Sequence, residues 1–340
     1  LGALWVRERD TNAELRLELA QIQAADDATA TEIEELSNQI TALELRNDQL
    51  AREKAELEPL VADVPPGRLS VIDIPFDPVF VDEVRGQFLA VAASGDYVVW
   101  AGGVESQITD FGTVAGSPTG MFAARDQAFI ASDAGQVEVV SLIGGEDATP
   151  IPTGALVGMV QDNRQFWGFE PDSGELRRHR STNGRLTTSV ALPTAVTELS
   201  VGAGAVWALG TDGMVYRINT ADFTLTPISA GQDLVAITAG PDALWTLSAA
   251  DGSLRRVDAV SGEVLVTVPV GRDPIDAEFS GNSVWVALRS GSALIEVDTR
   301  TSAVVSRTSL PAEPISVSSG ETGVLVTLDA EDPLVRVASD

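Results

Sequence analysis

The chain has 340 residues, and 44% of them are hydrophobic, enough to bury the core of one large domain or of two smaller ones. Its 22 basic and 50 acidic residues give a net charge of −28, which argues against nucleic acid or an anionic membrane surface as a partner, since both require clusters of lysine and arginine. Because the sequence contains no cysteine, disulfides, thiolate metal sites and cysteine nucleophiles are excluded.

The first six residues, LGALWV, are apolar and are followed at once by the charged stretch RERD. They are either the first turn of the helix that follows or the end of a membrane or signal segment, and the second interpretation predicts an extracytoplasmic, membrane-anchored protein. No run of 18 apolar residues occurs, so the sequence holds no complete transmembrane helix.

Residues 1–61 predict a long helix, because Ala, Leu, Glu, Gln and Arg dominate and glycine is absent from Glu8 to Val61. Apolar residues recur there with heptad spacing, which predicts a coiled coil. Its oligomerisation seam consists of Ile33, Leu36, Ile40, Leu43, Asn47, Leu50 and Leu57. Asn at one a position and Leu at every d position favour a parallel dimer, and Ile at two a positions leaves a trimer open. The alternative is a helix that packs on the domain that follows.

Residues 62–67, ADVPPG, predict a short, stiff linker, because two prolines and a glycine end the helix. Beyond them the hydrophobic period changes from that of a coiled coil to that of β-strands, so residues 68–340 predict a separate all-β domain.

This domain is built from repeats, of which Ser253–Leu288 is a complete example with four short strands. A bulky residue marks the second strand of seven units: Trp100, Phe129, Trp167, Trp207, Trp245, Trp285 and Leu325. The last five intervals between these markers are nearly equal, at about 40 residues each, whereas the first interval is clearly shorter. Such a period predicts a β-propeller of seven four-stranded blades. The short first interval leaves six blades with an irregular insertion as the alternative.

The last unit supplies only three strands before Asp340. Arg68–Pro75 resembles the outer strands of other units, and we therefore expect it to complete the last blade and close the ring. Phe76–Gly86 is then left as a connecting excursion before the first blade.

The stretches SGEVLVTVPVGRDPIDAEFSGNSVWVAL and ALIEVDTRTSAVVSRTSLPAEPISV resemble the YVTN-type repeats of bacterial and archaeal propellers and the repeats of the streptogramin (virginiamycin B) lyase propeller. The resemblance covers residues 68–340 at the level of the repeat. A lyase likeness implies histidines and acidic residues around the central channel with a divalent metal. His179 is the only histidine of the chain, so that catalytic set cannot be carried over.

Three carboxylates, Glu198, Asp276 and Glu278, fall on first strands where other units have Ser or Thr. First strands line the channel of a propeller, so these side chains are candidates for binding a cation or a basic side chain. The alternative is that they are solvated carboxylates in a wet channel.

The run Arg177, Arg178, His179 and Arg180 is the only basic cluster of the acidic domain and is a candidate patch for an acidic partner segment. Arginine recurs at the position of Arg178 in other units, which favours a structural role in the blade. His179 itself stands where other units have Ile or Val, which favours packing over catalysis.

No nucleophile elbow, phosphate loop, zinc signature or nucleotide fingerprint occurs. These features predict a non-enzymatic binding or scaffolding protein without a cofactor, oligomerised by its coiled coil and presenting the propeller to protein or glycan partners. One alternative is a lyase or hydrolase with a metal-assisted site at the channel mouth, built on Asp276 and Glu278. Another is an accessory subunit of a membrane complex.

Overall fold

The computed structural model describes Asn38, Ile40 and Thr41, and residues 62–63, 69–72, 74–101, 107–144, 147–320, 323–330 and 333–338. The first three residues are helical, and the Ile40 side chain is buried. The rest of the predicted coiled-coil seam lies outside the described residues: Ile33, Leu36, Leu43, Asn47, Leu50 and Leu57. None of the described helical residues belongs to a helix long and apolar enough to cross a membrane.

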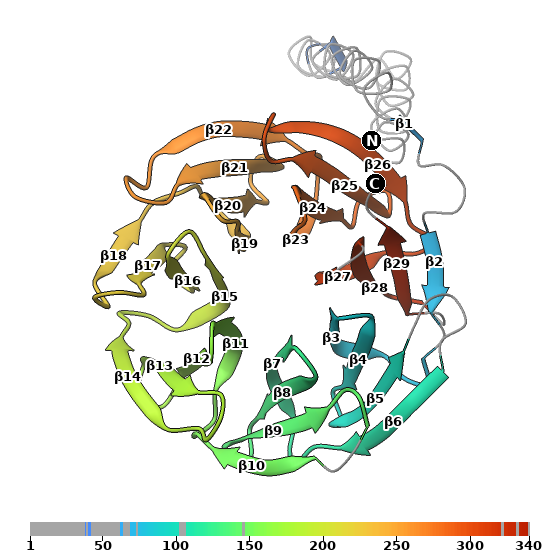
Figure 1. The fold of residues 1–340 in the computed structure, drawn as a ribbon. Coiled ribbons are helices and arrows are strands. Elements are labelled where there is room, and N and C mark those ends of the chain that lie inside the picture. Colours follow the sequence, from blue (N-terminus) through green and yellow to red (C-terminus); the bar gives the residue numbers. More distant parts are fainter. Residues whose placement is uncertain are drawn as a thin grey trace, which may run out of the picture.

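Seven antiparallel four-stranded blades surround a central axis (Figure 1). Blade I contains β3 (Pro78–Val84), β4 (Gln87–Ala92), β5 (Asp96–Ala101) and β6 (Gln107–Thr113), and blade II contains β7 (Pro118–Ala124), β8 (Gln127–Ser132), β9 (Gln136–Ser141) and β10 (Ala148–Pro152). Blade III contains β11 (Val157–Asp162), β12 (Gln165–Glu170), β13 (Glu175–Arg180) and β14 (Leu186–Ala191), and blade IV contains β15 (Val196–Gly202), β16 (Ala205–Gly210), β17 (Val215–Asn219) and β18 (Leu225–Ile228).

Blade V contains β19 (Leu234–Ala239), β20 (Ala243–Ser248), β21 (Ser253–Asp258) and β22 (Val264–Pro269). Blade VI contains β23 (Pro274–Ser280), β24 (Ser283–Leu288), β25 (Ala293–Asp298) and β26 (Ala303–Ser309). Blade VII contains β27 (Pro314–Gly320), β28 (Gly323–Leu328), β29 (Leu334–Ala338) and, from the start of the chain, β2 (Leu69–Ile72).

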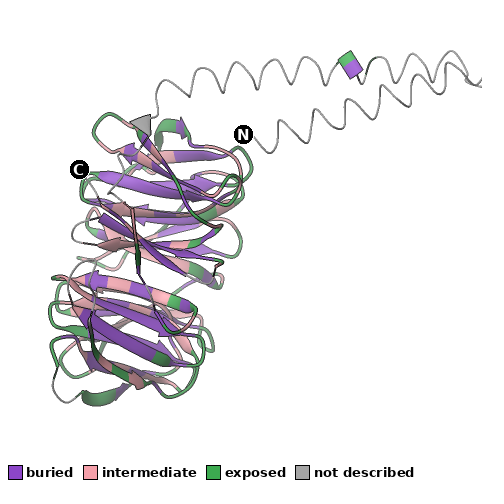
Figure 2. Ribbon diagram, turned by 90° about the vertical axis from the view of Figure 1, so that its right-hand side faces the viewer, coloured by how far each residue is buried: buried purple, intermediate pink, exposed green. Residues whose placement is uncertain are grey.

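The hydrophobic core lies between adjacent blades, because each blade is covered on both faces by its neighbours. The second strands are therefore apolar on both faces, and every residue of β16, β20, β24 and β28 is buried. Five of the marker residues, Trp167, Trp207, Trp245, Trp285 and Leu325, are at most 1% exposed. Figure 2 shows the same distribution, with buried residues along the strands and exposed residues in the connections.

The N-terminal strand β2 closes the ring, as the sequence predicts. It pairs antiparallel with β29, with Leu69 opposite Val337 and Ile72 opposite Leu334. This pairing supplies the fourth strand of blade VII and covers the edge that β29 would otherwise expose (Figure 1). The predicted linker begins with a two-residue strand, β1 (Ala62–Asp63), which pairs in parallel with the outer edge of β26 in blade VI.

Blade I corrects the predicted arrangement. Phe76–Gly86 is not a connecting excursion, because it contains β3, the innermost strand of the blade. The second strand is β4, where Leu89 precedes Phe129 by one full repeat, and Trp100 lies in the third strand. Trp100 stacks on Phe88 of the second strand, with ring centroids 5.3 Å apart, so the large aromatic ring is supplied by a different strand in this blade. The first blade is therefore complete, and the six-bladed alternative is wrong.

Candidate functional site

The central channel encloses a cavity of about 580 Å³, and the first strand of every blade contributes to its wall. Three acidic side chains line it, namely Asp82 on β3 and Asp276 and Glu278 on β23, and the described lining contains no Lys, Arg or His. The rest of the wall combines the amide of Gln161 and small hydroxyl side chains with apolar ones such as Phe122 and Val317. The channel is therefore a polar, acidic cavity.

The register of the first strands explains why the acidic side chains meet there. Asp82 and Glu278 occupy the same position in their blades, opposite Leu89 and Trp285 of the second strand. Other blades have Phe122, Val160, Ser200, Thr238 and Ser318 at this position. Asp276 and Glu198 lie two residues earlier in their strands, so the alternation of a β-strand places them on the same side as this position.

Each of three carboxylates accepts a backbone hydrogen bond from the first strand of the next blade. The N–H group of Ala123 donates to Asp82 Oδ2 at 2.6 Å, that of Ile237 to Glu198 Oε2 at 2.7 Å, and that of Val317 to Asp276 Oδ2 at 2.8 Å. The first strand of a blade is a sheet edge whose outward N–H groups lack a strand partner. The carboxylates therefore satisfy backbone donors and link neighbouring blades.

Hydroxyl groups form the same link at the position of Asp82 in blades IV and V. The N–H groups of Ala239 and Phe279 donate to Ser200 Oγ and Thr238 Oγ1, each at 2.9 Å, again from one blade to the next. This substitution of hydroxyl for carboxylate indicates that the link needs an acceptor oxygen and does not need a charge.

Burial in the channel raises the pKa of Asp276 to about 6, that of Asp82 to about 7 and that of Glu278 to about 8. The pKa of Glu198 is also raised, by burial first and then by Asp276. The nearby Asp276 charge adds to the upward shift of Glu278 as well, whereas backbone N–H donors partly offset the shifts of the other three. The cluster therefore retains protons near neutral pH. Within the described part of the chain, no three Asp, Glu or His side chains are grouped so that they can hold a metal ion.

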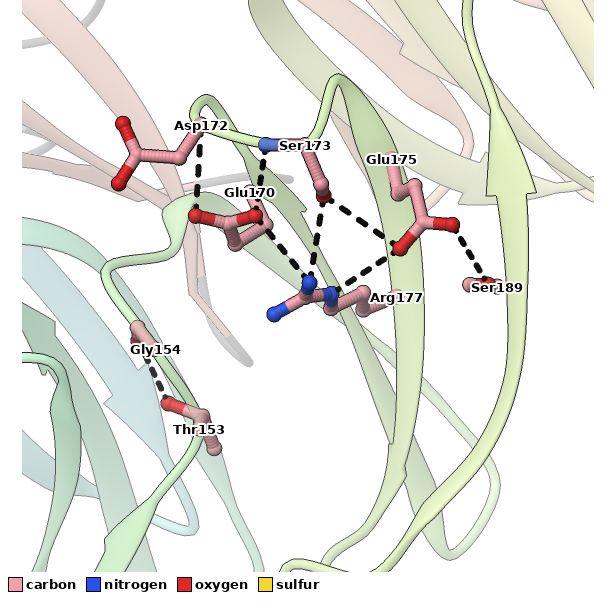
Figure 3. A network of polar contacts seen from close by, with 8 residues as sticks. All are labelled: Thr153, Gly154, Glu170, Asp172, Ser173, Glu175, Arg177 and Ser189. Carbon is pink, nitrogen blue, oxygen red and sulfur yellow. Dashed lines mark hydrogen bonds and ion pairs between the residues drawn. The ribbon is translucent and has the colours of Figure 1, made fainter.

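The basic run on β13 does not form one exposed surface. Strand alternation places Arg177 and His179 on one face and Arg178 and Arg180 on the other, and among the four only Arg180 is exposed. Arg177 binds the carboxylates of Glu170 at 3.2 Å and Glu175 at 3.4 Å (Figure 3).

Arg178 is also engaged within the propeller. Its guanidinium pairs with Asp162 at 3.4 Å and lies over the rings of Trp167 and Phe223, at 5.5 and 5.4 Å from their centroids. Arg217 over Trp207 and Arg256 over Trp245 repeat the stacking in the next two blades. In blades III to V the recurring arginine therefore packs against the marker tryptophan of its own blade.

His179 is a core residue. It is 3% exposed and stacks on Phe166 with ring centroids 5.3 Å apart. Its Nδ1 lies 2.8 Å from the carbonyl oxygen of Gly184, and burial lowers its pKa, so the neutral ring donates through Nδ1. His179 lies opposite Phe166 of the second strand, and in the next blade Ile218 lies opposite Val206 in the same way. His179 therefore occupies the packing position that the repeat predicts.

Asp82 is a channel residue that the spacing of the markers does not predict. It lies in the segment interpreted as a connecting excursion, where no position in the repeat was assigned. The repeat offered a signal, because stepping back one period from Phe122 on β7 leads to Asp82 on β3.

No family model and no curated protein matches the chain. Solved structures do match. The WD40 β-propeller domain of Doa1 has a TM-score of 0.66 and 15% identity, covering 81% of this chain and 98% of its own. The structure of U3-55K has a TM-score of 0.66 and 8% identity, covering 81% of this chain and 99% of its own. At these identities the likeness shows the fold alone, a WD40-like seven-bladed β-propeller.

Proposed function

We propose that the chain is a non-enzymatic binding or scaffolding protein whose propeller presents a face to a protein or glycan partner. One observation carries this proposal: Asp82, Glu198 and Asp276 each use an oxygen to bind a backbone N–H of the next blade. At the position of Asp82 a hydroxyl group replaces the carboxylate in two other blades, so these three carboxylates have a sufficient explanation in the construction of the ring. The most conspicuous chemical groups of the propeller are thus part of its scaffold.

The charge of the propeller restricts the partner. Six of the 22 basic and 15 of the 50 acidic residues precede Arg68, which leaves 16 basic and 35 acidic residues and a net charge of −19 for residues 68–340. A surface of this charge repels nucleic acid and anionic membranes and favours a basic or neutral partner. A glycan or a basic protein segment fits this requirement.

Self-association through residues 1–61 belongs to the same proposal. The heptad pattern and Asn47 favour a parallel dimer, with a trimer as the alternative. Coupling two propellers raises their avidity for a repetitive or surface-bound partner, a gain that serves binding and has no evident use in catalysis.

The apolar start LGALWV supports an extracytoplasmic, membrane-anchored location. The resemblance of the repeats to YVTN-type propellers fits such a binding head. An accessory subunit of a membrane complex is a variant of the same architecture, with the helix as a tether.

A second candidate function is a lyase or hydrolase that acts in the channel. One observation favours it: Asp276, Asp82 and Glu278 have pKa values of about 6, 7 and 8 in one cavity, which suits exchange of protons with a substrate near neutral pH. In this alternative a divalent metal would assist at the channel mouth.

Elemental analysis of the purified chain distinguishes the binding protein from the metal-assisted enzyme. The variants Asp276→Asn and Glu278→Gln keep an acceptor oxygen but lose the charge, and Asp126→Asn removes an exposed carboxylate elsewhere as a matched control. We expect no stoichiometric divalent ion in any of the four proteins. One ion per chain that is lost from both channel variants and kept in the control would favour the enzyme and contradict the scaffold.

Binding itself is tested with a glycan array and a peptide display library, both probed with the full chain. The matched variant Leu43→Lys with Leu50→Lys breaks the predicted seam and leaves the propeller sequence intact. We expect a selected ligand on a surface to bind the parent chain at least about tenfold more tightly than the variant. Equal binding by the two proteins would contradict the proposed role of the coil.

A further inference from the structure

The outer edge of blade V is apolar and uncovered. Three consecutive side chains at the start of β22, Val264, Leu265 and Val266, are 43%, 53% and 37% exposed. Val260, in the turn that precedes the strand, is 85% exposed. No ionisable residue occurs from Val264 to Pro269. An edge strand with free backbone groups, apolar side chains and no charge tends to pair with a strand of another chain.

The other described outer strands each have a feature that discourages such pairing. Prolines interrupt β10 and β18, and β6 carries Asp110. Strand β14 is rich in Ser and Thr, and β2 has only four residues. On blade VI, β1 already covers β26. Strand β22 is thus the apolar edge that the fold leaves without protection among the described blades.

The outer strand of blade VI already pairs with an added strand, β1, at the position that is open in blade V. Ala62 of β1 pairs with Ser306, which in turn lies opposite Glu296 of the third strand. Val266 lies opposite Arg256, and Glu296 and Arg256 face the marker tryptophans of their blades. Ser306 and Val266 therefore occupy the same position in adjacent blades. Blade VI receives an added strand at this position, and the same position on blade V is open.

The point at which residues 1–61 join the propeller lies one blade away from this edge. Because Ala62 is fixed on β26, residues 1–61 join the propeller at the outer edge of blade VI, beside blade V. If two copies associate through residues 1–61, as proposed above, each propeller joins that association at the blade next to β22. Two propellers with a net charge of −19 each repel one another, so an edge without ionisable groups is where they can approach.

We propose that β22 pairs antiparallel with β22 of a second copy about a twofold axis, which joins two blades V into one eight-stranded sheet. An isologous contact of this kind uses the same patch on both copies and closes after two. Backbone hydrogen bonds supply the pairing, and Val264, Leu265 and Val266 bury their apolar surface across the axis. This inference rests on the self-association proposed above and assigns it a second contact.

The absence of cysteine from the chain permits a direct test. Single substitutions Val264→Cys, Leu265→Cys and Val266→Cys place one thiol on the edge, and Val71→Cys and Ile108→Cys place one at exposed apolar positions on blades VII and I as controls. Opposed residues of an antiparallel pair lie close enough for a disulfide. Under mild oxidation of the full chain at low concentration, we expect at least one β22 variant to form a disulfide-linked dimer about tenfold faster than either control.

Light scattering on the same samples separates the possible failures. If the chain is oligomeric but the three β22 variants cross-link no faster than the controls, the edge contact is wrong and the self-association stands. If the chain is a monomer, both are wrong. A second variant checks the mechanism: Leu265→Lys in the Val266→Cys protein should keep the melting temperature and reduce the cross-linking rate at least tenfold, because each copy would bring an ammonium group close to the twofold axis and the two charges would repel. An undiminished rate would overturn the pairing.

Discussion

Arg336 of blade VII and Glu83 of blade I form an ion pair across the seam where the ring closes, with 3.4 Å between Nη2 and Oε1. The Glu83 side chain is 1% exposed, and the Arg336 guanidinium also lies 5.4 Å from the ring centroid of Phe88 in blade I. By contrast, Arg217 and Arg256 stack within their own blades. Arg336 thus reaches from the last blade to the first.

Replacing Arg336 by Ala should lower the free energy of unfolding by about 3 kcal/mol, because the buried Glu83 carboxylate loses its ion pair with Arg336. Urea unfolding followed by tryptophan fluorescence measures the change. Arg289→Ala is the matched control, since Arg289 and Asp273 lie 3.9 Å apart with both side chains about half exposed. The control should lose less than about 1 kcal/mol. Equal losses of stability in the two variants would show that the Arg336–Glu83 pair contributes no more than an exposed surface pair.

Closure by β2 predicts different effects for two neighbouring residues. Ile72 is 8% exposed and packs in the core between blades VII and I, whereas Val71 is 46% exposed. Ile72→Ala should therefore cost about 2–4 kcal/mol of stability, and Val71→Ala less than about 0.5 kcal/mol. Deletion of residues 68–75 should destabilise the whole propeller. An unchanged melting temperature after the deletion would refute closure by this strand.

Much of the fold was predictable because the blades repeat. The regular spacing of the markers located blades II to VII, and the missing fourth strand of the last blade pointed to Arg68–Pro75. The prediction failed in blade I, where Trp100 served as a marker although it lies in the third strand. A bulky residue in the sequence indicates that its side chain fills the space between two blades. Either of two adjacent strands can supply that side chain, as Phe88 and Trp100 do together, so the residue alone does not identify its strand.

The candidate site was predictable only in part. The repeat placed Asp276 and Glu278 on a first strand and therefore in the channel, but the hydrogen bonds that link blades depend on the distance between adjacent first strands, which no local pattern encodes. The prediction that the basic run forms a binding patch failed because the run is local in the sequence but divided in the strand. Its arginines look like a patch in the sequence, yet alternation separates them, and Arg177 finds carboxylates from a neighbouring strand and from its own.

The channel carboxylates should make the propeller less stable as the pH rises from 5 to 8. Their pKa values in the unfolded chain are near 4, and in the folded protein those of Asp276, Asp82 and Glu278 are raised to about 6, 7 and 8. In this window the folded state holds protons that the unfolded state has released, so the free energy of unfolding falls with rising pH, by at most about 8 kcal/mol when each group titrates at its stated pKa. The fall should level off above pH 8. Urea unfolding at each pH measures it.

A double variant isolates this effect from that of His179. The lowered pKa of His179 acts in the opposite direction, because its contribution to stability is lost as the pH falls through the histidine range. Asp276→Asn with Glu278→Gln should flatten the pH dependence, and Asp126→Asn should leave it unchanged. The same slope in the parent chain and the double variant would contradict the raised pKa values.

The central claim, that copies of the chain assemble to present their propellers, is tested most directly by the mass of the intact protein in solution. Light scattering should give two or three times the chain mass of 35.7 kDa. Asn47→Leu should retain an assembly, because it adds apolar surface to the seam, but should change its number of copies or mix several. A mass of 35.7 kDa for both the parent chain and the Asn47→Leu variant would contradict the account.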